Sequence, residues 1–250
     1  LGKEVESIGA YAFYNCTNLI DVGLEDCINI GEHAFEGCEN LSYIFIWGNE
    51  NTIEIGDYAF YGCDALKNVF LRGDSFNIAD SPNVFPEGVI IEGRCDGAKA
   101  YAEKYNIEYD DLSTKAEGNL TDTASWIIYN NNNLNIWGKG IIPDSDGYNP
   151  WSEYADDIKN IFINSDIVYI GDYAFYNCKN AETIEYYGVY STEAHVIGNH
   201  AFDGCEKLKE FIAFYEFVEI GDYAFYNCDS MEDIFIYNSE CVIADSEFVF

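Results

Sequence analysis

Apolar residues recur along this chain in a pattern that is repeated six times. Each copy reads Ile-Gly-x-x-Ala-Phe-x-x-Cys, and an apolar-x-apolar pair follows after a short interval, as in Ile44-x-Ile46. The copies occupy 8–16, 30–38, 55–63, 170–178, 197–205 and 220–228. One such copy cannot bury its apolar side chains alone, so it must stack on its neighbours. The pattern therefore predicts short parallel strands stacked into a mostly β solenoid, with little helix.

A longer period divides the repeats into two arrays. Each array holds three strong copies and a weak fourth, and the weak copies begin at Ile78 and Ile243, 165 residues apart. After the first array, the apolar spacing of 98–105 predicts a short amphipathic helix between two strands, which would close the array as a C-terminal cap. The second array stops before an equivalent cap, so we expect the native protein to continue beyond Phe250.

The segment between the arrays has a pattern of its own. Alternating residues at 126–129 and 134–138 flank an Asn-rich turn, which predicts a β-hairpin. We expect this segment to cap the start of the second array. The predicted organisation is a first array with its cap at 1–112, a β-hairpin linker and cap module at 113–162, and a second array at 163–250.

These residues resemble the BspA-like class of leucine-rich repeats, whose repeat is similar to L-x-x-I-x-I-P-x-x-V-x-x-I-G-x-x-A-F-x-x-C. The resemblance covers nearly the whole chain and implies a leucine-rich-repeat solenoid. It also implies a surface protein of mucosal bacteria or parasitic protists that acts as an adhesin or interaction module. One departure is notable: this chain lacks the proline after the strand and carries bulky residues at outward strand positions.

Composition narrows the classes of partner. The 250 residues include 45 Asp and Glu against 12 Lys and Arg, which gives a formal net charge of −33. Such a charge repels phosphate, so binding to nucleic acid and docking on an anionic membrane leaflet are both disfavoured. The 48% of hydrophobic residues supports a packed core, and no apolar run is long enough for direct membrane insertion within this chain.

The nine cysteines are the first candidates for chemistry. Six share one repeat position: Cys16, Cys38, Cys63, Cys178, Cys205 and Cys228. Free cysteine is among the most buried residue types, so we expect a ladder of buried, reduced and inert thiols. Disulfides between adjacent rungs are the alternative, because the spacing of strands falls within the Cα range of a disulfide. Of the cysteines outside the ladder, Cys95 is expected to be the most exposed.

No other pattern predicts catalysis, a metal or a cofactor. His33 and His200 occupy a position that is Tyr in other copies, so we interpret them as repeat variants, and His195 is expected in a loop. The oxygen-rich stretch 144–149 resembles a calcium loop, but its Gly is at the fourth position rather than the sixth that an EF-hand needs. An Asp- and Gly-rich turn is the favoured interpretation. We expect no enzymatic activity.

The strands predict a binding face. Residues that alternate with the inward pair of each strand point outward, and stacked strands would align them in two columns per array. The bulky outward residues of the first array are Phe45, Trp47, Phe70 and Arg72. Those of the second array are Tyr187, Ile212, Phe214, Phe235 and Tyr237. Large exposed apolar patches mark interaction sites, so these residues are the predicted ligand-binding positions.

The partner follows from this face and from the charge. We predict a non-catalytic, adhesin-like module at the cell surface or outside the cell. It would bind a protein or glycan of a host or neighbouring cell, with a bias toward basic or neutral partners. Self-association through the exposed face is an alternative, and loops or the neighbouring array covering the face is another. A structural spacer that displays another domain would instead have polar, unremarkable outward positions.

Overall fold

The structure is a computed structural model that describes residues 5–25, 27–48, 51–164, 166–187, 195–213, 217–236 and 242–243. It divides into two units, Leu1–Ser113 and Thr114–Phe250. Each unit has its own cluster of buried apolar side chains. The segment predicted as a hairpin module lies in the second unit, where Trp126 and Trp151 share one core with Phe175 and Phe202 of the repeats.

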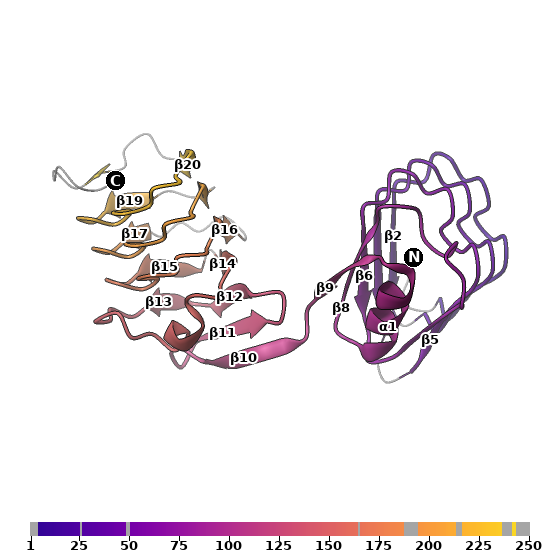
Figure 1. The fold of residues 1–250 in the computed structure, drawn as a ribbon, viewed down its shortest axis with the longest axis horizontal. Coiled ribbons are helices and arrows are strands. Elements are labelled where there is room, and N and C mark those ends of the chain that lie inside the picture. The colour runs from indigo at the N-terminus through magenta and orange to yellow at the C-terminus, as the bar shows by residue number, and fades with distance from the viewer. Residues whose placement is uncertain are drawn as a thin grey trace. The chain divides into compact units, whose positions relative to one another are not determined.

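In the first unit, short and long strands alternate along the chain, and one of each kind makes a rung (Figure 1). Over the described residues, the short strands form a sheet in the order β1 (Ser7–Ile8), β3 (Asn29–Ile30), β5 (Ile53–Ile55) and β7 (Phe76–Ile78). The second sheet has the order β2 (Asp21–Glu25), β4 (Tyr43–Trp47), β6 (Asn68–Arg72), β8 (Ile90–Gly93) and β9 (Glu108–Asp111). Every neighbouring pair is parallel, which confirms the predicted solenoid.

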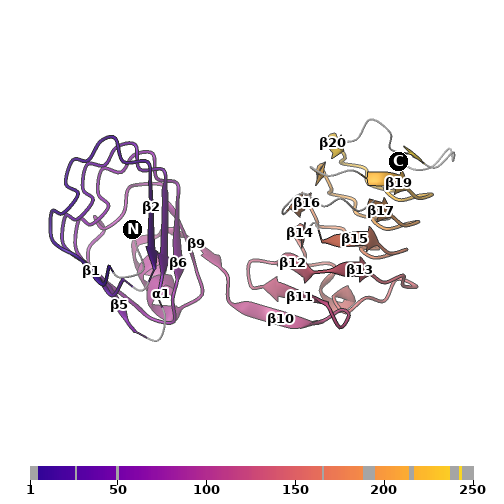
Figure 2. The same cartoon turned by 180° about the vertical axis from the view of Figure 1, so that it is seen from behind.

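The second unit has the same arrangement of two sheets, and a hairpin precedes its repeats in the chain (Figure 2). In its described part, the larger sheet has the order β10 (Thr114–Asn119), β11 (Ala124–Tyr129), β12 (Asn133–Gly138), β14 (Asn160–Asn164), β16 (Thr183–Tyr187), β18 (Glu210–Ala213) and β20 (Asp233–Ile236). The smaller sheet has the order β13 (Gly140–Ile142), β15 (Ile167–Ile170), β17 (His195–Ile197), β19 (Phe217–Ile220) and β21 (Val242–Ile243). β10, β11 and β12 pair antiparallel, so the predicted hairpin is present, and β12 then pairs parallel with β14.

The predicted helix closes the first array. α1 (Asp96–Tyr105) packs against β7, β8 and β9, the last strands of the two sheets. Its buried face carries Ala98, Tyr101 and Ala102. The Tyr101 hydroxyl donates to the Ser81 carbonyl at 2.7 Å, so the one polar atom of that aromatic side chain is satisfied. The only other helical segment in the described residues is a 3-10 turn at Ser152–Tyr154.

In the four copies at 30–38, 55–63, 170–178 and 197–205, the Ala, Phe and Cys of the motif are buried in the core. The phenylalanines stack from rung to rung: Phe35 and Phe60 lie 5.3 Å apart between ring centroids, and Phe60 and Phe85 lie 5.5 Å apart. The second unit has the same ladder, and Trp151 of the cap begins it by stacking on Phe175 at 5.4 Å. The aromatic ladder therefore continues from the cap into the repeats.

The left-handed backbone positions of the motif do not include the Gly that follows the Ile. They are the Tyr or His two positions after that Gly, and the Asn or Gly before the Cys, as at Tyr58 (φ 55°) and Gly62 (φ 72°). The Gly after the Ile instead allows two rungs to approach closely. A Cβ on Gly56 would lie only 2.6 Å from the Glu32 nitrogen of the adjacent rung.

Candidate binding faces

Four aromatic side chains gather on the outer surface of β4 and β6, and we call this group the aromatic face: Tyr43, Phe45, Trp47 and Phe70. The strand register places Phe45 beside Phe70 and Trp47 beside Arg72, as the sequence predicted. Ring centroids lie 5.2 Å apart for Tyr43 and Phe70, 6.0 Å for Phe45 and Trp47, and 6.4 Å for Phe45 and Phe70. The rings therefore form one contiguous patch.

The aromatic face is accessible. Trp47 is 51% exposed, Tyr43 is also exposed, and Phe45 and Phe70 are partly exposed. Tyr43 was not among the predicted residues, because those were the outward positions between and after the inward pair. The residue before that pair also points outward, and strict alternation along the strand would have identified it.

Acidic side chains border this face on both sides. On β2, Asp21 lies beside Tyr43 and Glu25 lies beside Trp47. On β8, Glu92 lies beside Phe70, and Asp110 of β9 lies beside Glu92. Burial raises the pKa of Glu92, an effect that Asp110 reinforces; the Asn68 amide, which donates to the Glu92 carboxylate, and the Arg72 charge oppose it. The aromatic face thus lies between carboxylates.

The sequence predicted Arg72 as an outward residue of the binding face, but its side chain is less accessible than expected. It is only partly exposed, and its Nε is buried without a hydrogen-bond partner in the described structure. Its charge lies close enough to Glu92 to oppose the rise that burial causes in the pKa of that carboxyl. Arg72 therefore compensates one carboxylate at the edge of the face and does not reverse the acidic character of the border.

The outward column of the second unit is less uniform. Glu185, Ile212 and Phe235 align across β16, β18 and β20, so an acidic residue precedes the two apolar ones. Phe235 and Tyr187 are exposed, whereas Ile212 is partly exposed. Phe214 and Tyr237 lie outside the described residues. The register adds Phe162, which lies beside Glu185 and was not among the predicted residues.

The cysteine ladder is present and hydrogen-bonded. The thiols of Cys38, Cys63, Cys205 and Cys228 each donate to the carbonyl of a motif Phe in the preceding rung, at 3.1–3.4 Å from sulfur to oxygen. The eight described cysteines are all free, and Cys241 lies outside the described residues. Cys16, in the first rung, is exposed and Cys228 is partly exposed, so the expected burial of the ladder fails at those two positions. Outside the ladder, Cys95 is buried, although it is slightly more exposed than Cys27.

Native thiol reactivity should follow this burial. Burial raises the pKa of Cys63 and of Cys178 to about 12, which suppresses the reactive thiolate near neutral pH. We expect a thiol reagent at pH 8 to modify Cys16 much faster than Cys63 or Cys178 in the native protein, and all three at similar rates in denaturant. Mass spectrometry of the modified peptides measures this, with Cys16→Ala as the control that removes the fast phase. Native labelling of Cys63 as fast as that of Cys16 would contradict it.

The histidines belong to the repeat architecture. His200 stacks between Tyr173 and Tyr223, with ring centroids 4.7 and 4.8 Å apart, and its Nδ1 contacts the Asp203 carboxylate at 2.8 Å. His33 stacks in the same way in the first unit and contacts Glu36. Both occupy the Tyr position of the repeat, as predicted. His195 does not lie in a loop: it is a fully buried residue of β17.

The oxygen-rich stretch 144–149 is bonded within the protein. The Asp144 carboxylate accepts hydrogen bonds from the Tyr169 hydroxyl at 2.6 Å and the Asp172 nitrogen at 2.9 Å, and these bonds lower its pKa. The Ser145 hydroxyl accepts from the Gly147 nitrogen at 3.1 Å. In the described part of the chain, no three His, Cys, Asp or Glu side chains are grouped to hold a metal ion. The geometry is that of a hydrogen-bonded turn.

Comparison with known proteins identifies the repeats. The family model of the BspA type leucine rich repeat region matches residues 1–83 and 152–250, in 6 copies. The chain belongs to the BspA-type leucine-rich repeat family. Solenoids of this type are extended scaffolds whose repeated faces suit recognition. Within the described residues, no helix is long and apolar enough to cross a membrane. Among curated proteins, none matches the chain significantly.

Three solved structures are similar to this member of the BspA type. A leucine-rich repeat protein from Eubacterium ventriosum has 28% identity and a TM-score of 0.40, over 53% of this chain and 40% of that one. One from Bacteroides ovatus has 24% identity and a TM-score of 0.32, over 95% and 65%. A leucine rich cell surface protein from Faecalibacterium prausnitzii has 20% identity and a TM-score of 0.26, over 94% and 84%. The chain thus spans less than two thirds of the first two proteins.

Proposed function

We propose that this BspA-type chain is a non-catalytic recognition module, exposed at the cell surface or secreted, whose aromatic face binds a basic segment of a partner protein. The observation that carries the proposal is the contiguous patch of Tyr43, Phe45, Trp47 and Phe70 on the outer surface of β4 and β6. Membership of the BspA type supports the surface location, because the resemblance implies surface proteins.

The exposure of the aromatic face supports binding over a spacer role. Exposed aromatic rings on the outer surface of a sheet lower solubility and are not part of the buried core. Contiguous apolar patches of this kind usually mark interaction sites, and Trp and Tyr are frequent energetic anchors. A spacer would be expected to carry polar residues at the same positions, as Asn68 does beside Tyr43.

Charge supports a basic protein segment as the partner. Asp21 and Glu25 flank the rings on one side, and Glu92 and Asp110 extend the acidic border on the other. A peptide with alternating cationic and apolar side chains would bury its apolar groups on the rings and pair its Lys or Arg with the carboxylates, with cation–π contacts to Trp47. The net charge of −33 attracts such a partner and repels acidic ones.

A peptide probe tests the proposal. A synthetic peptide of alternating Lys, Arg and apolar residues should bind the chain, and a version with Glu in place of Lys and Arg should not. Trp47→Ala should weaken binding about tenfold or more, as at other aromatic anchors, while the melting temperature stays nearly unchanged because the side chain is exposed. Binding should also weaken with added salt. Biolayer interferometry and thermal melts measure these effects.

The matched control is Trp137→Ala. Trp137 is 41% exposed on β12 of the second unit, where its partner in the hairpin is Ser125 and not another ring. This variant should bind the probe like the parent chain. Phe235→Ala tests whether the second unit contributes. Equal binding by the Trp47 and Trp137 variants would contradict the proposal. Self-association lost in Trp47→Ala would instead indicate that the face binds a second copy, and unfolding of that variant would place Trp47 in the core.

A further inference from the structure

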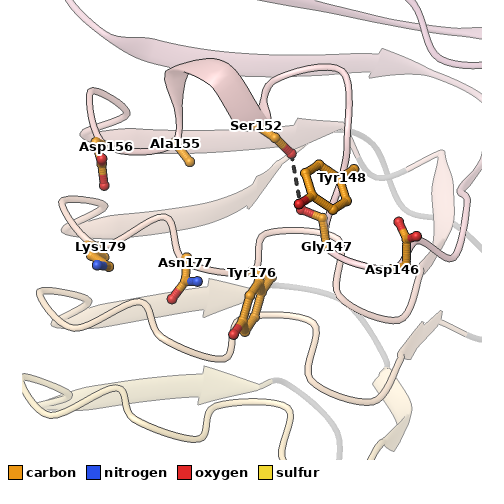
Figure 3. Close-up of a pocket in the computed structure, with 9 residues that line it drawn as sticks. All are labelled: Asp146, Gly147, Tyr148, Ser152, Ala155, Asp156, Tyr176, Asn177 and Lys179. Atoms are coloured by element: carbon orange, nitrogen blue, oxygen red, sulfur yellow. Dashed lines mark hydrogen bonds between the residues drawn. The ribbon is translucent and has the colours of Figure 1, made fainter.

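A pocket of about 420 Å³ opens on the second unit (Figure 3). Three segments form it: the loop at 146–148, the segment around the 3-10 turn, and the turn that surrounds Cys178 in the first repeat of this unit. The lining side chains that carry its chemistry are Asp146, Tyr148, Asp156, Tyr176, Asn177 and Lys179. The volume is that of a small-molecule site.

Hydrogen bonds fix the walls of this pocket. The Asn149 amide donates to the Tyr173 carbonyl at 3.0 Å, and the Asn149 nitrogen donates to the Ser152 hydroxyl at 2.6 Å. The Ser152 hydroxyl in turn donates to the Gly147 carbonyl at 3.3 Å (Figure 3). Buried Trp151 donates from Nε1 to the Ala174 carbonyl at 3.1 Å. A ligand would therefore enter a pocket that is already formed, which reduces the entropic cost of binding.

Two tyrosine rings border the pocket from different segments. Tyr148 is 83% exposed and Tyr176 is 38% exposed. The loop backbone rests against the Tyr176 ring, since a Cβ on Gly147 would lie 3.2 Å from its Cδ1. Because most of its surface is exposed, Tyr148 contributes little to packing within the protein. Its ring offers a flat apolar surface to a ligand in the pocket.

The polar side chains of the pocket have bonding capacity to spare. Among the described residues, the carboxylates of Asp146 and Asp156, the amide of Asn177 and the ammonium of Lys179 make no hydrogen bond or ion pair with another side chain. Carboxylates accept, an ammonium donates, and an amide does both, so the four groups together suit a ligand rich in hydroxyls. Figure 3 shows Asp146 on one side of the pocket and Asp156, Asn177 and Lys179 on the other.

We propose that this pocket binds a pyranose sugar, as a free hexose or as one residue of a glycan. The apolar C–H face of the sugar would stack on Tyr148 or Tyr176, and its hydroxyls would donate to the aspartates and accept from Asn177 and Lys179. Charge-assisted hydrogen bonds of this kind are the stronger ones. Two carboxylates against one ammonium disfavour an anionic ligand, and the described residues hold no third carboxylate for a metal site here.

The test uses the whole chain and a panel of methyl glycosides of glucose, galactose, mannose and N-acetylglucosamine, followed by saturation-transfer NMR and calorimetry. At least one glycoside should bind saturably. Tyr148→Ala and Tyr176→Ala should each weaken that binding by about tenfold or more, the usual effect of removing an aromatic anchor. Asp156→Asn should also weaken it, because a hydroxyl loses its charged acceptor.

Tyr226→Ala is the matched control. Tyr226 occupies the position of Tyr176 in the last strong repeat, is also 38% exposed, and meets the preceding motif Tyr edge to face in the same way. It should leave glycoside binding unchanged, as should Trp47→Ala, which separates this pocket from the aromatic face. The proposal is overturned if no glycoside binds, if the Tyr148 and Tyr176 variants bind like the Tyr226 variant, or if a simple polyamine competes better than any sugar.

Discussion

Replacing Phe60 by alanine should cost the first unit about 3–5 kcal/mol, the usual range for a fully buried Phe, and leave it close to unfolding at room temperature. Phe60 stacks on Phe35 and on Phe85, nearly parallel to both rings. Its loss leaves a cavity in the middle rung and breaks the aromatic ladder there. In a repeat protein each rung is stabilised mainly by its neighbours, so the strands on both sides of the cavity lose support.

Phe13→Ala is the matched control for this prediction. Phe13 occupies the same motif position in the first rung, but it is only partly buried and stacks on one ring, Phe35. We expect a loss of about 1–2 kcal/mol, since Phe13 buries less apolar area than Phe60 and its removal breaks one stacking contact rather than two. Urea denaturation, with hydrogen exchange at β5 (Ile53–Ile55) and β7 (Phe76–Ile78) as a local readout, measures both. Equal losses in the two variants would contradict a ladder held by its interior rungs.

Most of the fold follows from the sequence because the repeats reinforce one another. A single Ile-Gly-x-x-Ala-Phe-x-x-Cys segment would be ambiguous, but six copies with an apolar-x-apolar strand after each one have a single stacked solution. The helix and the hairpin were predictable for a different reason. Tyr101 and Ala102 follow a helical period, and the Asn-rich turn before Leu134 separates two alternating runs.

The errors arose where tertiary packing decides burial. Cys95 lies in a polar stretch, yet it is buried in the core of the first unit, directly before α1. His195 was expected in a loop, but β17 pairs with β15 and β19 and carries it into the core. Similarly, the residue types did not predict the left-handed backbone conformation of Tyr58, because residues with bulky side chains rarely adopt it.

The candidate sites differ in how far they were predictable. The two outward columns depend only on alternation along each strand and on register, so the repeat pattern alone is enough to place Phe45, Trp47 and Phe70 together. Of the acidic border, Asp21, Glu25 and Glu92 follow from the same register, whereas Asp110 requires the pairing of β8 with β9. The pocket at Tyr148 is formed by three segments separated in sequence. The sequence predicted only the Asp- and Gly-rich turn at 144–149, which forms one of them.

The spacing of the rungs leads to the second large effect. Gly56→Ala should destabilise the first unit by about 1–3 kcal/mol or more, the cost of forcing extra atoms into a packed site. The new Cβ would lie 2.6 Å from the Glu32 nitrogen and 2.8 Å from the Gly31 carbonyl carbon, both backbone atoms of the adjacent rung. Neither can rotate away, so the rungs must separate. That separation would also stretch the hydrogen bond from the Gly56 nitrogen to the Ile30 carbonyl, now 2.8 Å.

Gly9→Ala is the control, because Gly9 holds the same motif position in the first rung and a Cβ there meets nothing within 4 Å. Neither glycine has a positive φ, so alanine is free of backbone strain at both sites. Gly9→Ala should therefore be neutral or stabilise the unit by up to about 1 kcal/mol, through the lower entropy of the unfolded chain. Urea denaturation of the two variants gives the difference. If Gly56→Ala were as stable as Gly9→Ala, the distance between rungs would have to be set by side-chain packing, and the recurrence of Gly after each motif Ile would need another explanation.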